Sequence, residues 1–498
     1  MSGSSPGGGF DDPSSLADTI FAPATAIGKA AIAVLRLSGP GTARALIALI
    51  GDLPSPRTAR RRRLTHPDNG EPLDDALVLW FPAPASFTGE DIAELHLHGS
   101  RAVLAAVIDA LGGLGLRLAE PGEFTRRAFY NGKLDLTQAE AIADLTAAET
   151  EAQRRQALRQ LDGELGGLYR DWSQRLTRTL AHVEAAIDFP DEDLPPAIEQ
   201  RIVAETRSLR TEIAGHLADG HRGERLRDGI TIAIVGPPNA GKSSLLNRIA
   251  RREAAITSPI PGTTRDIVEV AIDLAGYPVI LADTAGLRES NDPIEQEGLR
   301  RAHRRAAEAE IRLFVFDART PADAAGAMAW PGPDTIVVAN KIDLLGSADP
   351  RLSQRETVMP GLDPSTHGTR REAVSCRTDS DDRDKPDLDA EVARSKSHPE
   401  AWFPVSALTG EGLDALLQVL AARLAAAHRI EGPVLTRARH RHALEDAAAS
   451  LDRALAADLS ELRAEDLRLA LRCLGQITGA VGVEDLLDII FRDFCLGK

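Results

Sequence analysis

The stretch from Ile232 to Ser243 reads IAIVGPPNAGKS, an apolar run that leads directly into the pattern Gly-x4-Gly-Lys-Ser. The apolar run predicts a buried strand, and Ser244–Ile249 has the composition of a helix that would follow it. Glycines let main-chain N–H groups wrap phosphate oxygens where such a helix begins. Lys242 can reach the β and γ oxygens, and the Ser243 hydroxyl can ligate Mg²⁺. Strand, glycine loop and helix in this order predict a nucleoside-triphosphate site on an α/β sheet.

Further segments with the chemistry of a guanine-nucleotide site follow in chain order. Asp283-Thr284-Ala285-Gly286 comes after an apolar run, which would place the Asp283 carboxylate near the metal and the Gly286 N–H near the γ-phosphate. Thr264, in an earlier segment, is a candidate second hydroxyl ligand of Mg²⁺. Asn340-Lys341-Ile342-Asp343 also follows an apolar run, and its last carboxylate can accept hydrogen bonds from the N1–H and exocyclic amine of guanine. Ser406-Ala407-Leu408 can contact the guanine O6.

These motifs together predict a GTP site. Its expected contacts are Asn239, Ala240, Gly241, Lys242, Ser243, Ser244, Gly262, Thr263, Thr264, Asp283, Thr284, Ala285, Gly286, Asn340, Lys341, Ile342, Asp343, Ser406, Ala407 and Leu408. Ras-like enzymes orient the attacking water with a glutamine placed directly after the glycine of the Asp-x-x-Gly motif. This chain has Leu287 at that position, directly after Gly286. Another group must therefore position the water. The candidates are Glu289, Asp292, Glu295 and Glu297.

Composition limits the class of protein. A chain of 498 residues is expected to form about three domains. The net charge of −16 argues against a surface that binds nucleic acid through charge alone. Three cysteines, Cys376, Cys473 and Cys495, include no CxxC pair, which favours a reducing compartment over a zinc or disulfide framework. Because no apolar stretch approaches the length of a membrane span, we expect a soluble, cytoplasmic protein with no membrane contact.

The residue patterns divide the chain into parts. Residues 1–18 are expected to be a flexible tail, and 19–133 mix strand-like and helical runs, as an α+β domain does. Apolar residues three and four apart predict long helices over 134–228, and helices return over 426–498. Between them, 229–425 alternates apolar runs and helices. This predicts an α/β unit with parallel strands, inserted into one all-helical domain.

Two segments are expected to lie outside any core. Residues 346–400 contain no Phe, Tyr or Trp and are dense in Asp, Arg, Ser and Pro, so we expect a disordered insertion into the α/β unit. The run Arg60–Arg63 lies in a stretch flanked by prolines. We expect a solvated loop there, with a local basic patch as the alternative.

Beyond the nucleotide motifs, the chain resembles the MnmE (TrmE) family of tRNA modification GTPases. Only the tail and residues 346–400 lie outside the resemblance. The matching segments are Ala31–Gly39, Ser86–Asp91, His98-Gly99, Pro121–Phe129, Asn131–Asp135 and Phe494–Lys498. The resemblance implies that GTP hydrolysis drives the addition of a carboxymethylaminomethyl group to carbon 5 of wobble uridine 34 in certain tRNAs. It also implies a homodimer that works with an FAD-binding partner, MnmG (GidA), in a heterotetramer or larger complex.

Cofactors and further site residues come from the same resemblance. The N-terminal domain would dimerise and bind 5-formyl- or methylene-tetrahydrofolate, and the residues implied are Arg36, Glu94, Lys133 and Lys498. K⁺ would compensate for the missing glutamine by supplying positive charge beside the γ-phosphate. Its implied ligands are Asn239, Ser258, the carbonyl of Ile260, and Thr263, and Ser258, Pro259, Ile260 and Pro261 join the expected GTP contacts. Glu295 would position the attacking water, and Cys495 is either a nucleophile or a buried packing thiol.

Two other classes of protein share the GTPase core and differ in the flanking domains. A ribosome-assembly GTPase of the same branch, which is our alternative, would be expected to carry a KH-like domain or a second phosphate loop. The sequence has one GK[ST] loop and a helical C-terminal region. A membrane-tethered helical GTPase would need a basic amphipathic face, whereas the apolar stripe from Thr137 to Ile187 is narrow enough for packing in a bundle.

Overall fold

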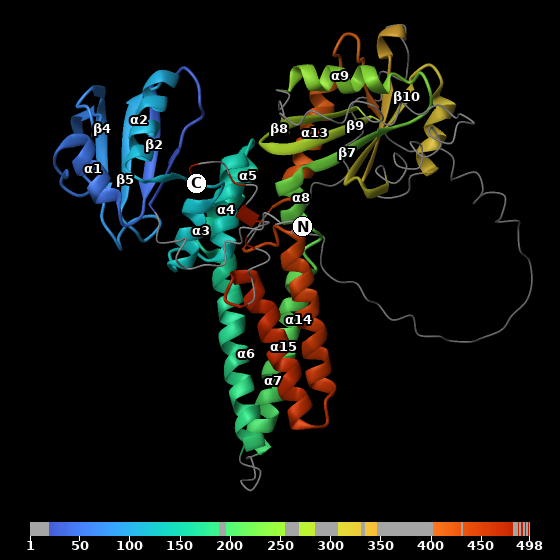
Figure 1. Ribbon diagram of the computed structural model, residues 1–498. Helices are drawn as coiled ribbons and strands as arrows, with labels where there is room; N and C mark the ends of the chain where they lie inside the picture. The colour runs from blue at the N-terminus through green and yellow to red at the C-terminus, as the bar shows by residue number, and fades with distance from the viewer. Residues whose placement is uncertain are drawn as a thin grey trace, which may run out of the picture. The chain divides into compact units, whose positions relative to one another are not determined.

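The computed structural model describes residues 19–188, 196–253, 268–283, 307–329, 334–345, 402–429 and 432–481, with residues 487, 490, 491, 494 and 497 near the C-terminus. The chain forms two compact units (Figure 1). The first combines Met1–Ala148, Arg154–Gly223 and Ile430–Lys498, and the second combines Glu149–Gln153 and Glu224–Arg429. The expected insertion of an α/β unit into a helical domain is therefore confirmed. This unit begins before the expected boundary at 229, because helix α8 (Arg222–Asp228) leads into it.

The N-terminal part of the first unit is a six-stranded sheet, in the order β3-β4-β5-β2-β1-β6, with helices on one face. Leu35, Leu37, Leu95 and Leu97 point into the core beneath helices α1 and α2. Side chains alternate along a strand, so the intervening residues face the other side of the sheet. The elements are β1 (Ile20–Pro23), β2 (Ile32–Ser38), α1 (Thr42–Ile50), β3 (Arg60–Thr65), β4 (Pro72–Phe81), β5 (Ile92–His98), α2 (Arg101–Gly113), β6 (Arg117–Leu118) and α3 (Glu123–Tyr130).

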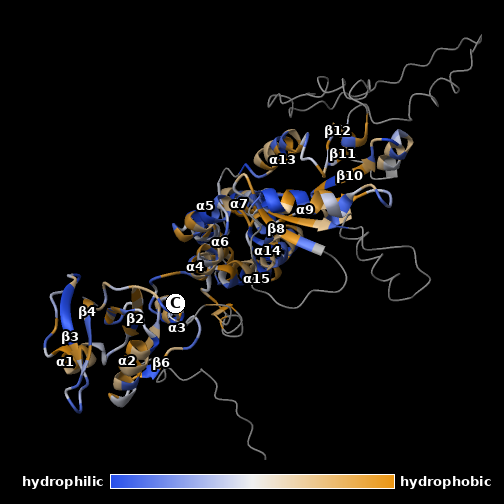
Figure 2. Ribbon diagram, turned by 90° about the horizontal axis from the view of Figure 1, so that it is seen from above, coloured by the Kyte–Doolittle hydropathy of each residue, from blue (hydrophilic) through white to orange (hydrophobic). Residues whose placement is uncertain are grey.

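The run Arg60–Arg63 is a strand, so the expectation of a solvated loop was wrong. It begins β3, the edge strand that pairs antiparallel with β4, and Figure 2 shows β3 as hydrophilic. Arg61 and Arg63 both lie against Asp75 on β4, at 3.6 and 3.1 Å. Pairing with β4 overrides the local preference of the arginines. Charged side chains on an edge strand also hinder pairing with another chain.

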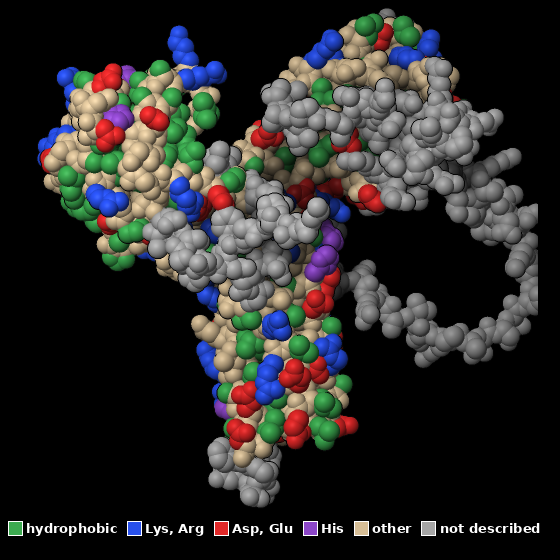
Figure 3. Space-filling model, viewed as in Figure 1, with side chains coloured by type: hydrophobic (Ala, Val, Ile, Leu, Met, Phe, Trp, Pro, Cys, Tyr) green, Lys and Arg blue, Asp and Glu red, His purple; other side chains and the backbone are tan. Residues whose placement is uncertain are grey.

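The rest of the first unit is helical. Its core is a bundle in which α6 packs on α7 and α15, and α14 packs on α7 and α15 (Figure 1). Leu176, Leu180 and Val183, from the stripe seen in the sequence, lie in this core. Acidic and basic side chains are mixed on the bundle surface (Figure 3), and pairs such as Arg453–Asp466 join neighbouring helices. The helices are α4 (Leu136–Ala147), α5 (Glu151–Leu161), α6 (Glu164–Asp188), α7 (Pro196–Leu217), α14 (Ala438–Ala456) and α15 (Ser460–Thr478).

The second unit contains another six-stranded sheet, in the order β12-β11-β10-β7-β9-β8. The five strands that match the apolar runs in the sequence are parallel, as expected. The sequence did not indicate β8, which pairs antiparallel with β9 at the edge. The elements are β7 (Ile230–Val235), α9 (Lys242–Arg252), β8 (Val268–Leu274), β9 (Tyr277–Asp283), β10 (Ile311–Asp317), η2 (Pro321–Ala329), β11 (Thr335–Asn340), η3 (Ile342–Leu344), β12 (Phe403–Pro404) and α13 (Leu413–Ala427).

None of the described helices combines the length and the apolar character needed to cross a bilayer. The segment 346–400, expected to be a disordered insertion, lies outside the described residues.

Candidate active site

The glycine loop connects the carboxyl end of β7 to α9. Gly236 has φ +136°, and a Cβ there would collide with the carbonyl of Val315 on the neighbouring strand β10. Asn239 and Gly241 also have positive φ, at 59° and 90°. Glycine is needed where the loop passes close to β10, because any side chain would push the two backbones apart. The loop is therefore built as the sequence pattern predicts, directly before the first turn of α9.

Lys242 is the first residue of α9, and its side chain turns back into this loop. Its side chain is buried, and Nζ donates to the carbonyls of Gly236 and Pro237, both at 2.8 Å. Burial lowers the pKa of Lys242, and the charge of Asp283 opposes this shift. The ammonium group is thus held inside the loop, close to where the N–H groups of a helix start attract anions. Ser243 and Ser244 are exposed in the first turn of α9.

Asn340 and Lys341 join the guanine motif to the phosphate loop. The Asn340 amide, at the end of β11, donates to the carbonyl of Ala240 at 2.8 Å, and its oxygen accepts from the N–H of Ala407 at 3.0 Å. Lys341 donates to the carbonyl of Asn239 at 2.6 Å and to Asp317 at 3.0 Å. Three loops that are far apart in the sequence therefore meet at the carboxyl edge of the sheet.

Asp343 and Ser406 form the next contact in this site. The Ser406 hydroxyl donates to the Asp343 carboxylate at 2.5 Å and accepts from the N–H of Thr409 at 3.0 Å. Ile342 is buried beside them, whereas Leu408 is 77% exposed. This arrangement orients a carboxylate oxygen and a main-chain loop around one position, which suits recognition of a base edge.

Asp317 is a site residue that the sequence analysis missed. It ends β10, contacts Lys341, and also accepts from Arg319 at 2.7 Å. The hydrogen bonds from Arg319 hold the pKa of Asp317 below its usual range. Its place at the end of an apolar run, like that of Asp283, was the available signal.

Arg36 and Glu94, implied together by the family resemblance, form an ion pair on the N-terminal sheet. They lie opposite each other on β2 and β5, and Arg36 Nη2 donates to Glu94 at 2.9 Å. Arg36 Nη1 also donates to the carbonyl of Gly497 at 3.3 Å, so the C-terminal segment reaches this face of the sheet. Gly497 has φ +90°, and a Cβ there would meet the carbonyl of Pro23 on β1. The structure thus brings these two residues beside the position that precedes Lys498.

Comparisons with known proteins cover almost the whole chain. The model described as "GTP-binding protein TrmE N-terminus" matches residues 19–133, and the model described as "MnmE helical domain" matches 136–495. The tRNA modification GTPase MnmE of Rhodospirillum rubrum is 54% identical over 97% of this chain and 99% of its own length. This chain belongs to the MnmE family.

Other relatives named as MnmE proteins or related synthases agree with this assignment. The tRNA modification GTPase MnmE of Parvibaculum lavamentivorans is 53% identical, over 97% of this chain and all of its own length. The Homo sapiens mitochondrial protein named 5-taurinomethyluridine-[tRNA] synthase subunit GTPB3 is 47% identical, over 96% of this chain and 93% of its own length.

The remaining residues expected from the nucleotide motifs or from the MnmE resemblance fall into two groups. Lys133 is described, and its Nζ donates to the carbonyl of Pro84 at 2.9 Å. Asp283 is also described, buried at the end of β9. The others lie outside the described residues: Ser258, Pro259, Ile260, Pro261, Gly262, Thr263, Thr264, Thr284, Ala285, Gly286, Glu295, Cys495 and Lys498.

A buried polar network supports the Arg36 face of the MnmE-type N-terminal sheet. The hydroxyl of Ser38, also on β2, lies 2.7 Å from both the Thr88 hydroxyl and Glu90. Arg127, which is 1% exposed, donates to Glu90 at 3.2 Å and to Glu123 at 2.9 Å. The segments 86–91 and 121–129, which carried the family resemblance, meet in this network. Their part in the family resemblance was visible in the sequence, but their contact was not.

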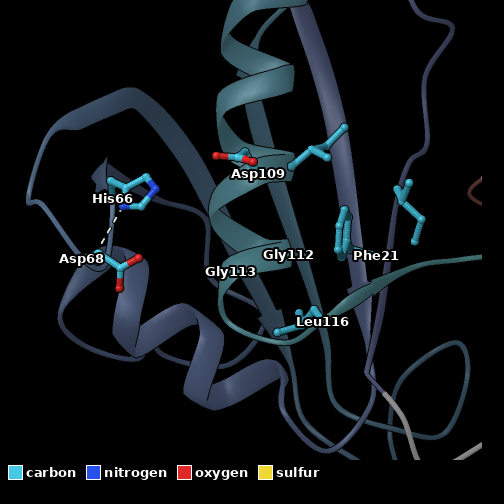
Figure 4. A pocket seen from close by; sticks show the side chains of 9 residues that line it. Phe21, His66, Asp68, Asp109, Gly112, Gly113 and Leu116 are labelled. Carbon is cyan, nitrogen blue, oxygen red and sulfur yellow. Dashed lines mark hydrogen bonds between the residues drawn. The ribbon is translucent and has the colours of Figure 1, made fainter.

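A hollow of about 540 Å³ lies in the same N-terminal part of the chain. Figure 4 shows His66 and Asp68 on the turn after β3, and Asp109 on α2. Phe21 and Leu116, which also line the hollow, belong to the core under α1 and α2, so the hollow lies away from Arg36. The complete lining is Phe21, His66, Asp68, Ile108, Asp109, Gly112, Gly113, Leu116 and Leu118.

Proposed function

We propose that this chain is a GTP hydrolase whose cycle drives modification of wobble uridine 34 in certain tRNAs. The observation that carries the proposal is the linkage of Asn340 and Lys341 to the phosphate loop, within a chain of the MnmE family. This linkage sets the distance between a base-recognising carboxylate, Asp343, and the ammonium group of Lys242. A guanine nucleotide with its phosphates at the start of α9 fits that arrangement.

The residues have separate roles in the proposed reaction. Asp343 would accept hydrogen bonds from guanine, and Lys242 would leave its loop carbonyls to meet the β and γ oxygens. Mg²⁺ would be held by Ser243 and Thr264 and would neutralise charge on those oxygens. K⁺, at Asn239, Ser258, Ile260 and Thr263, would supply the positive charge that stabilises the leaving phosphates. Glu295 would position the attacking water.

The N-terminal domain would bind a tetrahydrofolate one-carbon donor. Glu94 suits the donor edge of a pterin, and Arg36 suits an anionic tail or a polarised carbonyl. Their ion pair shields both charges, and the approach of Gly497 supports a role for the next residue, Lys498. Lys133 would complete the site. The family model over 19–133 supports an N-terminal domain with these bounds.

The partners follow from the same proposal. The chain would form a homodimer through its N-terminal domains and work on tRNA with the FAD-binding protein MnmG in the cytoplasm. GTP and K⁺ would bring the α/β units of the dimer together, and hydrolysis would separate them.

The deciding experiment is GTP hydrolysis measured in KCl and in NaCl at equal ionic strength. We expect a rate that is at least about tenfold higher in KCl, because the missing glutamine leaves the transition state dependent on the cation. Glu295→Ala should be slow in both salts, with unchanged GDP affinity. Equal rates in the two salts would contradict the proposed K⁺ site. The absence of hydrolysis in both salts would contradict the proposal that the chain is a GTP hydrolase.

A further inference from the structure

Glu310 binds two segments through which the chain enters and leaves the α/β unit. Its carboxylate lies 2.7 Å from Nε2 of His428, directly after α13, and 3.2 Å from Nη1 of Arg225 on α8. The His428 side chain is fully buried and that of Glu310 is 14% exposed. The unit begins at Glu224 and ends at Arg429, so both partners of Glu310 stand one residue inside its limits.

A third segment of the unit is held next to the same helix. Gln153 donates from its side chain to the carbonyl of Arg227 at 3.0 Å, and the N–H of Ala152 donates to the carbonyl of Gly276 at 3.0 Å. Residues 149–153 belong to the α/β unit, although helix α5 continues in the other unit. The points at which the chain passes between the units are therefore tied to α8 or to Glu310 itself.

Glu310 lies at the end of the sheet opposite the nucleotide site. Its N–H donates to the carbonyl of Thr231 at 3.1 Å, beside the start of β7, and β10 begins at the next residue. β10 ends in Asp317, which contacts Lys341 of the guanine motif. At about 3.3 Å per residue, the strand separates these two carboxylates by roughly 20 Å. The carboxylates at its two ends thus connect the guanine site with the chain crossings.

We propose that Glu310 is a positioning residue that makes the chain crossings at α8 and α13 move together and so passes the nucleotide state of the α/β unit to the rest of the chain. This inference rests on the proposed GTPase function and names the element that couples it to tRNA modification. A shift of β7 or β10 reaches α8 through the backbone. The shared carboxylate makes the end of α13 follow, because its two oxygens hold both Arg225 and His428. Without it, the two crossings could respond separately.

The test compares GTP hydrolysis with tRNA modification in the full-length chain and its flavin-binding partner. Glu310→Gln keeps the size of the side chain but removes its charge. We expect hydrolysis to stay within about twofold of the unaltered chain, while modification per GTP hydrolysed falls at least about fivefold, the lower end of typical coupling between sites. Arg225→Gln, at a 43% exposed side chain, should give a smaller loss in the same direction.

Asp414→Asn is the matched control, because Asp414 pairs with Arg252 in the same unit, at the opposite end of α13 from the crossing at His428. It should leave both activities and their ratio unchanged. The proposal is overturned if Glu310→Gln modifies tRNA as efficiently per GTP as the control. It is also overturned if hydrolysis and modification fall by the same factor, since that indicates a structural role. If thermal melting shows that Glu310→Gln does not fold, Arg225→Gln takes its place in the test. The proposal is then overturned if Arg225→Gln modifies tRNA as efficiently per GTP as the control, or if both of its activities fall by the same factor. Absence of hydrolysis in the unaltered chain would instead contradict the proposed function, and the coupling with it.

Discussion

The Asn340 side chain donates to the carbonyl of Ala240 at 2.8 Å, across one hundred residues of sequence. The same side chain accepts from the N–H of Ala407, and it is 1% exposed. A single amide group thus holds the phosphate loop and the loop after β12 at fixed positions. In the proposed function these two loops bind the phosphates and the base, and holding them in place reduces the entropy lost when a nucleotide binds.

Replacing this amide should harm both stability and nucleotide binding. Asn340→Ala leaves the buried carbonyl of Ala240 and the half-buried N–H of Ala407 without this partner, at a cost of about 1–3 kcal/mol for the buried group and less for the other. GDP affinity should also fall, because the two loops lose their alignment. Urea denaturation and titration with a fluorescent GDP would measure the two effects. Asn247→Ala, at an exposed position on α9, should change neither, and equal behaviour of the two variants would refute the alignment role.

Asp343→Asn should change the base that the site accepts. The carboxylate offers two acceptors to the N1–H and amine of guanine, whereas an amide offers one acceptor and one donor. The amide complements xanthine, which carries a carbonyl in place of the amine. GTP affinity should fall by at least about a hundredfold, since a site built to hydrogen-bond one ligand rejects a ligand that leaves its groups mispaired, and XTP should bind better than GTP. Competition binding with GTP, XTP and ATP checks this. Retained preference for GTP would show that Asp343 does not read the base.

Deleting residues 495–498 should separate the two activities. Arg36 would lose its contact with the carbonyl of Gly497, and the proposed folate site would lose Lys498. The α/β unit is a separate compact unit, so GTP hydrolysis should persist while tRNA modification is abolished. Hydrolysis and modification are measured on the same preparation. Loss of both activities would mean that the terminal segment is structural.

Glu140→Gln should strongly destabilise the first unit. Glu140 is 1% exposed and accepts hydrogen bonds from Arg439 at 2.6 and 2.8 Å and from His440 at 2.9 Å. Burial alone would raise the pKa of Glu140, but the charge of Arg439 and the hydrogen bonds from Arg439 and His440 hold it below its usual range. Removing one charge from a buried set typically costs about 3–5 kcal/mol.

The control for Glu140→Gln is an exposed ion pair on the surface of the same helical bundle. Glu184 contacts Arg468 at 3.0 Å, and both side chains are about half exposed. Glu184→Gln should cost no more than about 1 kcal/mol, because solvent screens this pair. Chemical denaturation of both variants measures the loss in the free energy of unfolding for each. A cost below 1 kcal/mol for Glu140→Gln would show that its ion pairs only offset the penalty of burial.

His216 should make stability depend on pH. Burial among Tyr169 and Trp172 lowers its pKa to about 4, and Asp219 opposes this shift. The unfolded chain takes up a proton near pH 6.5, where the folded chain does not. The contribution of neutral His216 to the stability of the fold is therefore constant above pH 6.5 and is lost as the pH falls toward 4. Between pH 7 and 5 the loss is about 2 kcal/mol. His216→Asn should remove that part of the pH dependence, and an unchanged slope would refute the assignment.

Local patterns in the sequence determine the chemistry of the nucleotide site. The spacing of Gly236, Gly241 and Lys242, and the placing of Asp283 and Asn340 after apolar runs, require only short-range structure. Parallel strands end at one edge of a sheet, so motifs that follow such strands converge whatever the rest of the chain does. The parallel sheet and the position of the phosphate loop could be predicted for this reason.

Tertiary structure alone decided which distant groups meet. Arg60–Arg63 became an edge strand because β4 offers hydrogen bonds and Asp75, which local preference does not reveal. Glu310 meets His428 and Arg225 across 118 and 85 residues, and Arg36 meets Gly497 across 461. Such contacts depend on how helices and sheets pack, and a composition or a spacing carries no information about that packing.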